Sequence, residues 1–374
     1  MAPSFASVED MRRRAKRRLP RAIFDYVDGG AGDERGVRRN REAIERRLLK
    51  LKPLTNVSQR DLTVPLLGGH LPLPFLIGPT GLNGAVMPGG DLALARAAAK
   101  FGIPFVLSTA SSMSIEDVAH QVDGELWFQL YVLNRDAARQ FVDRALNAGY
   151  RTLVLTVDVP VGGRRDRDFR NGFGVPFQMT PRFALDCALH PGWALKQLRG
   201  GAPQLANLRS TGATDANSQA LLMLRQMDAS FDWDDLKALR DRWPHRLIVK
   251  GLTDPADCAR CFSLGVDAVV LSNHGGRQLE DVVAGFDMID RIDVPEGKAL
   301  LVDGGFRRGA DIVKALALGA DAVMLGRATL YGLAAAGQAG VEQVIETLRL
   351  EIDNTLALIG CPNAADLGQD VLQD

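Results

Sequence analysis

The strongest constraint on the fold is an apolar run of strand length that recurs eight times along the chain. The eight runs cover residues 75–78, 104–108, 126–130, 152–156, 247–250, 268–271, 299–302 and 322–325. Amphipathic helical stretches lie between several of them, at 92–101, 137–148, 255–264 and 309–318. Eightfold strand–helix alternation is typical of a closed parallel barrel. We therefore predict an α/β fold, a (β/α)8 TIM barrel over about residues 73–350, within a single domain of residues 1–374.

An open doubly wound sheet is the alternative to this barrel. Such a sheet usually carries the phosphate-binding pattern G-x-G-x-x-G directly after its first strand. The chain has Gly78-Pro79-Thr80-Gly81 there instead, which does not fit that pattern. The closed barrel is therefore favoured.

Two segments lie outside the barrel rhythm. Residues 8–26 read as an N-terminal helical segment that Pro20 breaks in two and Gly29-Gly30 ends. After the fourth strand, a long insertion at about 176–212 exceeds what one strand–helix crossover needs. Its apolar residues, among them Phe177, Phe183 and Trp193, are interleaved with basic ones. This pattern suits either a lid over the barrel or a patch that contacts an anionic membrane surface, and both interpretations stay open.

Composition excludes several function classes. Lys and Arg number 45 and Asp and Glu number 45, so no net charge attracts nucleic acid. The chain contains no run of eighteen apolar residues, so we expect no transmembrane helix. Residues 1–20 lack the apolar core of a signal peptide. The four cysteines include only one C-x-x-C pair, Cys258 and Cys261, so we expect packing thiols, no metal and a reducing compartment.

Polar residues follow the predicted strands at their carboxyl ends, where TIM barrels carry their chemistry. They are Pro79, Thr80, Gly81, Ser108, Gln129, Tyr131, Thr156, Asp158, Lys250, Ser272, His274, Asp303, Gly304, Gly305, Gly326 and Arg327. A barrel with a purely structural role does not need polar residues at all eight strand ends. Together they predict one site at the mouth of the barrel.

Three features of these ends indicate chemistry. His274 and Arg277 combine a base that titrates near neutral pH with a fixed cation, which suits an acidic substrate that loses a proton. The glycine-rich stretch from Asp303 through Phe306 and Arg307, together with Gly326 and Arg327, is typical of a phosphate cradle after strands seven and eight. Lys250 is either a Schiff-base nucleophile or a cation beside an electron-rich ring.

These motifs resemble the FMN-dependent L-2-hydroxy acid dehydrogenases and oxidases over nearly the whole chain. The most specific match is Ser-Asn-His-Gly-Gly-Arg-Gln at 272–278, supported by Lys250-Gly251, residues 156–158, residues 129–131 and residues 303–305. Residues 78–84, 225–231 and 326–332 are most similar to the branch that oxidises (S)-mandelate. Oxidase members often have alanine where this chain has Gly81.

The resemblance implies an FMN cofactor and a role for each matching residue. His274 is the implied base, Asp158 its partner, and Arg165 and Arg277 the clamp on the substrate carboxylate, with Tyr26 and Tyr131 as hydrogen-bond donors. The resemblance also implies that Lys250 lies near flavin N1 and stabilises the reduced flavin. The flavin ring, ribityl chain and phosphate are held by Pro79, Thr80, Gly81, Ser108, Gln129, Tyr131, Thr156, Ser272, Asp303, Gly304, Gly305, Phe306, Arg307, Gly326 and Arg327. Arg165 is chosen over its arginine neighbours by its distance from residues 156–158.

The resemblance also implies oxidation of (S)-mandelate to benzoylformate, with a membrane quinone as acceptor. It further implies a homotetramer attached peripherally to the cytoplasmic side of the cell membrane. L-lactate or glycolate is the alternative substrate. Two other classes fit parts of the pattern, a Schiff-base aldolase that uses Lys250 and a flavin-free isomerase that binds a phosphorylated substrate.

Overall fold

A computed structural model describes residues 5–173, 180–201, 203–211 and 227–373. Several predicted features lie outside these ranges. They are residues 176–179, 202 and 212 of the predicted insertion, Phe177 among them, and Arg225 and Gln226 of one motif.

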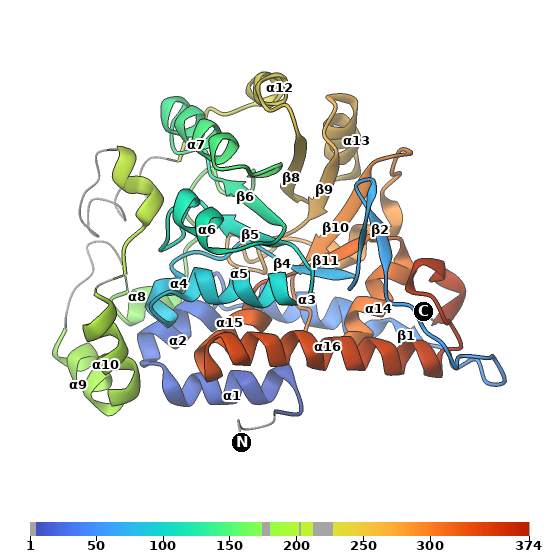
Figure 1. Cartoon of the computed structure of the whole chain (residues 1–374), viewed down its shortest axis with the longest axis horizontal. Helices are drawn as coiled ribbons and strands as arrows, with labels where there is room; N and C mark the ends of the chain where they lie inside the picture. The colour runs from blue at the N-terminus through green and yellow to red at the C-terminus, as the bar shows by residue number, and fades with distance from the viewer. Residues whose placement is uncertain (1–4, 174–179, 202, 212–226, 374) are drawn as a thin grey trace.

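The eight predicted strands form a closed parallel barrel, as the sequence pattern indicated (Figure 1). The barrel strands are β4 (Phe75–Ile77), β5 (Phe105–Ser108), β6 (Leu126–Leu130), β7 (Thr152–Thr156), β8 (Arg246–Leu252), β9 (Ala268–Leu271), β10 (Ala299–Asp303) and β11 (Ala322–Leu325). Every residue of β4, β5, β7, β9 and β11 is buried, because helices cover the outside and side chains fill the inside. The predicted TIM barrel is therefore confirmed.

Helices follow most of the strands and pack around the barrel (Figure 1). They are α4 (Asn83–Val86), α5 (Gly90–Lys100), α6 (Ile115–Gln121), α7 (Arg135–Asn147), α8 (Asp166–Arg170), α12 (Trp233–Arg242), α13 (Pro255–Ser263), α14 (Gly309–Leu318), α15 (Arg327–Ala336) and α16 (Gln338–Leu358). The connection after β9 differs from simple alternation, as does the long β7–β8 connection. After β9, residues 272–284 form a loop, and the 3-10 helix η2 (Gly285–Arg291) follows where an α-helix would be expected.

Strand β8 is longer than predicted and carries an irregularity that serves the site. Its register with β9 shifts between Lys250 and Leu252. Gly251, between them, has φ +107°, and an added Cβ would lie 2.7 Å from Cβ of Asp158. A glycine is required here, because only its missing side chain lets Asp158 approach the strand end.

The N-terminal segment covers the carboxyl end of the barrel. Pro20 separates α1 (Val8–Arg18) from α2 (Arg21–Asp28), as predicted, and Gly29 caps α2. Helix α3 (Arg35–Arg46) follows, and its Asn40 exchanges two side-chain hydrogen bonds with Asn273, each 2.8 Å long. Two short sheets, β1 (Leu48–Leu49) with β12 (Leu372–Gln373) and β2 (Val64–Leu66) with β3 (Gly69–Leu71), lie outside the barrel.

The described part of the insertion forms a helical hairpin at one edge of the molecule (Figure 1). It consists of α9 (Pro181–Leu189) and α10 (Pro191–Gly200), followed by the 3-10 helix η1 (Ala206–Thr211). Phe183 is buried, whereas Leu185, Leu189 and Leu198 are largely exposed. Among the described residues, no helix is both long and apolar enough to cross a membrane.

Candidate active site

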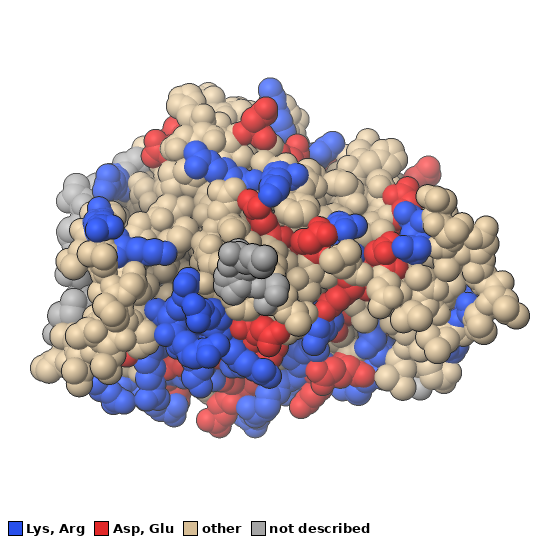
Figure 2. All heavy atoms as spheres, turned by 60° about the horizontal axis from the view of Figure 1, so that its bottom comes forward, with Lys and Arg blue, Asp and Glu red and all other residues tan. Residues whose placement is uncertain are grey.

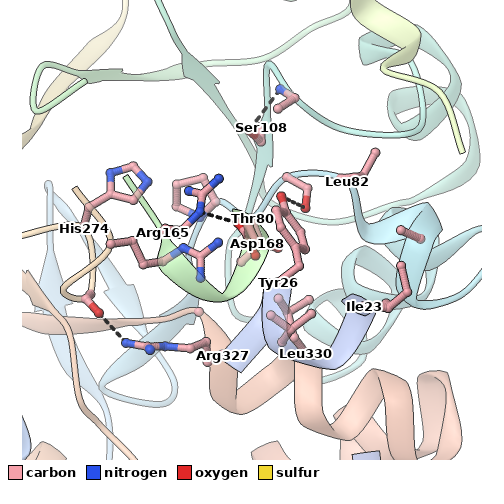
Figure 3. A pocket seen from close by; sticks show the side chains of 18 of the residues that line it. Ile23, Tyr26, Thr80, Leu82, Ser108, Arg165, Asp168, His274, Arg327 and Leu330 are labelled. Atoms are coloured by element: carbon pink, nitrogen blue, oxygen red, sulfur yellow. Dashed lines mark hydrogen bonds and ion pairs between the residues drawn. The ribbon is translucent and has the colours of Figure 1, made fainter. Parts of the chain in front are cut away.

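A large cavity of about 1090 Å³ lies at the carboxyl ends of the barrel strands. Its floor is made by residues at the ends of β4, β5, β7, β8, β10 and β11 and by Tyr131 beyond β6, and its sides come from α2, the β7–β8 connection and the α9–α10 hairpin. Figure 3 shows His274, Arg165 and Arg327 on one side and Ile23 and Leu82 on the other. The cavity thus has a polar part at the strand ends and an apolar part beneath the hairpin.

Most of the residues predicted from the sequence line this one cavity. They are Tyr26, Pro79, Thr80, Gly81, Ser108, Tyr131, Thr156, Arg165, Lys250, His274, Arg277, Asp303, Gly304, Gly305, Phe306, Arg307, Gly326 and Arg327.

Three predicted residues lie directly behind that lining, and each holds a residue that belongs to it. Gln129 accepts a 2.9 Å hydrogen bond from Ser108 Oγ and donates a 3.0 Å bond to Thr156 Oγ1. Ser272 accepts from Lys250 Nζ at 2.9 Å, and Asp158 binds His274. These three residues therefore position the lining rather than form it.

His274 stands between a carboxylate and a phenol. Its Nδ1 lies 2.9 Å from Asp158 Oδ1, and its Nε2 lies 3.3 Å from the Tyr131 hydroxyl. Burial opposes ionisation of Asp158, but attraction and hydrogen bonding from His274 outweigh burial and lower the pKa of that carboxyl. Burial raises the pKa of Tyr131, so the phenol keeps its proton. An ionised Asp158 fixes the proton of His274 on Nδ1 and leaves Nε2 as a base that faces the cavity.

The backbone of His274 has φ +56°, the left-handed region that residues with a Cβ seldom adopt. The backbone N–H of His274 donates a 3.0 Å hydrogen bond to Ser272 Oγ. Strain at a non-glycine residue is common where the surrounding structure holds a side chain in a functional position. The strain here turns the imidazole toward Asp158 and the cavity.

Two arginines converge on the polar part of the cavity beside His274. The guanidinium carbons of Arg165 and Arg277 lie 5.8 Å and 5.4 Å from the centre of the Tyr26 ring. Arg165 Nε donates a 2.6 Å hydrogen bond to Asp168. Burial lowers the pKa of Arg165, but the attraction of Asp168 outweighs that effect and raises the pKa.

Arg277 donates a hydrogen bond of 2.7 Å to the carbonyl of Gly29 and has no ion pair among the described residues. Burial and repulsion from Arg165 lower the pKa of Arg277 to about 10. An anion bound here would relieve both effects.

Lys250 is buried at the end of β8 and is fully paired. Its Nζ lies 2.8 Å from Asp303 Oδ2 and donates to Ser272 Oγ. Burial opposes its charge, but Asp303 and Asp158 outweigh burial and raise the pKa of Lys250. A Schiff-base lysine must be neutral to attack a carbonyl. The geometry therefore favours Lys250 as a fixed cation and argues against the aldolase alternative.

The glycine-rich ends of β10 and β11 form a cradle lined by arginines. Gly304 and Gly305 have φ +96° and +94°, and a Cβ on Gly305 would lie 2.9 Å from the backbone oxygen of Asn40. Burial lowers the pKa of Arg307, and Arg327 nearby adds to this effect. Arg327 donates to the carbonyls of Asp28 and Gly275. Two cations that contact carbonyls rather than carboxylates are typical of a site for an anionic group.

Sequence reasoning placed Tyr26 of the N-terminal segment at the site but missed the contributions of Asp168 and of the Gly29 carbonyl. Asp168 holds Arg165 from three residues further along the short helix α8, a spacing that places two side chains on one helix face. That charge spacing was visible in the sequence and would have supported the choice of Arg165. The carbonyl of Gly29, which holds Arg277, had no sequence signal, because any residue has a carbonyl.

Comparison with known proteins is consistent with this site. The family model described as FMN-dependent dehydrogenase matches residues 15–374. The (S)-mandelate dehydrogenase of Pseudomonas putida is 54% identical over 374 residues, which is 100% of this chain and 95% of that protein. An L-lactate dehydrogenase of Pseudomonas aeruginosa is 39% identical over 369 residues, or 97% of each chain. The crystal structure of the monotopic membrane protein (S)-mandelate dehydrogenase superimposes with a TM-score of 0.97 at 54% identity, covering 99% of this chain and 100% of that one.

Proposed function

The chain belongs to the family of FMN-dependent dehydrogenases, and from this premise we propose that it oxidises (S)-mandelate to benzoylformate and passes the electrons to a quinone. One observation carries the reaction type. The base His274, held by Asp158, lies beside a guanidinium, Arg277, that has no carboxylate partner among the described residues. A 2-hydroxy acid has the two groups that such a pair recognises, a carboxylate and a proton to remove.

The residues present fit FMN. Gly304 and Gly305 line the cavity at the end of β10 with backbone alone, and Arg307 and Arg327 offer cations to the phosphate of FMN. Thr80 Oγ1 and Asp303 Oδ1 are buried without a hydrogen-bond partner among the described residues, which suits a polar ring above them. Bound FMN would accept the two electrons that leave the substrate, and Lys250, which lines the cavity, would supply a positive charge to stabilise the reduced cofactor.

The protein's own groups bind the substrate and move its proton. Arg277 and Arg165 hold the carboxylate, which compensates the repulsion between the two guanidiniums. Tyr26 and Tyr131 offer hydroxyls to the carboxylate and to the hydroxyl oxygen. His274 accepts the proton at Nε2, and the imidazolium that forms is stabilised by Asp158 at 2.9 Å.

An aromatic substrate fits the walls of the cavity better than lactate or glycolate. Tyr26 and Phe173 pack at 5.0 Å between ring centres, and both line the cavity. Burying a phenyl ring contributes about 1.5–3 kcal/mol, or roughly ten- to a hundredfold in kcat/KM. We expect (S)-mandelate to exceed L-lactate by that factor in steady-state assays with an artificial dye. Equal or greater kcat/KM for lactate or glycolate would assign the chain to the alternative substrate.

We further propose that the protein attaches to a membrane surface through the α9–α10 hairpin. Leu185, Leu189 and Leu198 of the hairpin are 64%, 70% and 82% exposed. Figure 2 shows Lys and Arg side chains gathered on the lower face, where α1 lies in Figure 1. Exposed leucines beside basic residues suit an anionic lipid surface. Attachment to the cytoplasmic side of the cell membrane and assembly as a homotetramer follow from the family resemblance.

Sedimentation with anionic phospholipid vesicles tests this attachment. Changing Leu185 and Leu189 together to aspartate removes two apolar contacts, and we expect at least about a hundredfold weaker vesicle binding at low salt. The matched control changes Leu350 and Leu358, two exposed leucines of α16 that are 51% and 56% exposed. The control should sediment as the unmodified protein does. Equal loss in both variants, or loss in neither, would contradict a contact through the hairpin.

A further inference from the structure

We propose that the apolar part of the cavity binds the ring and first tail unit of a lipid-soluble quinone, so that the acceptor reaches the site from the membrane beneath the hairpin. This apolar limb is lined by Ile23, Leu82, Ala85, Phe183, Ala194 and Leu198. The inference rests on the proposed function, because it gives a place to the acceptor named there. It adds a binding site that is distinct from the substrate's position beside His274.

Hydrogen bonds from the α9–α10 hairpin to neighbouring segments hold it over the limb, so that its side chains line the limb without filling it. Trp193 Nε1 donates a 2.8 Å hydrogen bond to the carbonyl of Ala85, and Gln197 Nε2 donates a 2.8 Å bond to the carbonyl of Gly84. At the end of α10, a Cβ on Gly200 would lie 2.5 Å from Cβ of Pro88, so the backbone of Gly200 packs closely against the Pro88 ring. On the other side, the backbone N–H of Arg21 donates to Asp186. These contacts hold α10 against α4 and α9 against α2, with the limb between them.

The two ends of the cavity select opposite ligands. The end beside His274 carries Arg165 and Arg277, which attract an acid, whereas none of the six residues that define the limb is charged. Figure 3 shows Ile23 and Leu82 pointing into the side of the cavity away from His274. A neutral, apolar molecule therefore fits the limb, and the hydroxy acid does not. Both ends belong to one cavity, so an occupant of the limb lies next to the strand ends that fit the flavin.

The limb opens on the surface that we propose to contact lipid. Leu198 lines the cavity and yet is 82% exposed, so it stands at the mouth. Leu195, on the same helix, is also exposed. A molecule dissolved in the bilayer can then enter the cavity without crossing water, which favours an acceptor with an apolar tail over a soluble one.

One polar atom distinguishes a quinone from a lipid acyl chain. Gln197 lines the cavity, and its Oε1 is buried without a hydrogen-bond partner among the described residues. Its Nε2 donates to two backbone carbonyls, which fixes the orientation of the amide. A quinol hydroxyl can donate to Oε1, whereas an acyl chain would leave this buried acceptor unsatisfied. The reaction balances: the hydroxy acid loses two electrons and two protons, and the quinone gains both as it becomes the quinol.

Alkylation of Cys187 measures occupancy of the limb directly. Cys187 lines the cavity and is partly exposed, whereas Cys258, Cys261 and Cys361 are buried. In the FMN-loaded protein, decylubiquinone should slow alkylation of Cys187 by a maleimide at least about tenfold, and decanol at the same concentration should not. Equal protection by decanol would show that the limb takes any apolar chain, and absence of protection by decylubiquinone would place the quinone elsewhere.

A pair of variants tests the same site by kinetics. Ala194→Phe fills the limb, and Ala188→Phe places the same side chain on an exposed position of α9 that does not line the cavity. We expect Ala194→Phe to lower the rate of reoxidation by decylubiquinone, divided by the rate with an artificial dye, at least about tenfold. Ala188→Phe should leave that ratio unchanged. An unchanged ratio in Ala194→Phe would overturn the inference.

Assays of the unmodified protein distinguish a failure of this inference from a failure of the proposed function. If an artificial dye reoxidises the reduced protein but no quinone does, both the limb site and the quinone acceptor are wrong, whereas the oxidation of a hydroxy acid is still supported. If the hydroxy acid does not reduce the bound flavin at all, the proposed reaction itself is wrong.

Discussion

Replacing His274 with glutamine should slow reduction of the bound flavin by (S)-mandelate about a hundredfold or more, because general-base catalysis contributes at least that factor. Glutamine keeps a polar group near Asp158 but cannot accept a proton. Anaerobic stopped-flow absorbance, with substrate at saturation, measures the reduction rate directly. The large effect depends on the 2.9 Å contact of Nδ1 with Asp158, which leaves Nε2, facing the Tyr131 hydroxyl and the cavity, as the ring nitrogen that accepts a proton.

The control for this variant is His120→Gln, on an exposed position of α6. It should reduce at the rate of the unmodified protein. The visible spectrum of His274→Gln should still show bound flavin, because the cradle at β10 and β11 does not involve the imidazole. Near-normal reduction by His274→Gln would show that another group removes the proton.

Replacing Arg277 with lysine should lower kcat/KM for (S)-mandelate by about ten- to a hundredfold. A hydrogen bond to a charged group contributes about 1.5–3 kcal/mol, and lysine cannot reproduce the planar two-point contact of a guanidinium with a carboxylate. The position is demanding because Arg277 is anchored to the Gly29 carbonyl and has no ion pair among the described residues. Steady-state kinetics with a dye acceptor measures the change.

A lysine at another arginine position serves as the control for this second variant. Arg170 belongs to the same cluster of arginines as Arg165, but its side chain is 69% exposed and pairs with Asp166. Arg170→Lys should keep its kinetic constants. If Arg277→Lys also kept them, the substrate carboxylate would have to bind elsewhere.

The barrel could be predicted from sequence because its strands are buried on both faces. Such strands appear as continuous apolar runs, and the predicted runs at 268–271 and 322–325 coincide with β9 and β11. The position of the site could be predicted equally well, since the topology of a parallel barrel brings the carboxyl ends of all its strands to the same end of the barrel. The bulge at Gly251 could not be predicted, because it depends on the approach of Asp158 from the loop after β7.

Contacts between segments that are distant in the sequence could not be predicted. The side-chain amides of Asn40 and Asn273 join α3 to the loop that carries His274, and no local sequence pattern in either segment indicates this pairing. The insertion remained ambiguous for a similar reason, because a lid and a membrane patch both need apolar residues. The structure divides those residues between the two faces: Phe183 is buried over the cavity, and Leu185 and Leu189 are exposed.

Anaerobic titration of the purified yellow protein with the two enantiomers of mandelate tests the central claim most directly. We expect one equivalent of (S)-mandelate per flavin to bleach the absorbance of the oxidised cofactor and to yield one equivalent of benzoylformate. The (R) enantiomer cannot present its α-hydrogen to the base while its carboxylate is held by Arg165 and Arg277, so it should leave the spectrum unchanged. A flavin that stays oxidised in excess (S)-mandelate would contradict the account.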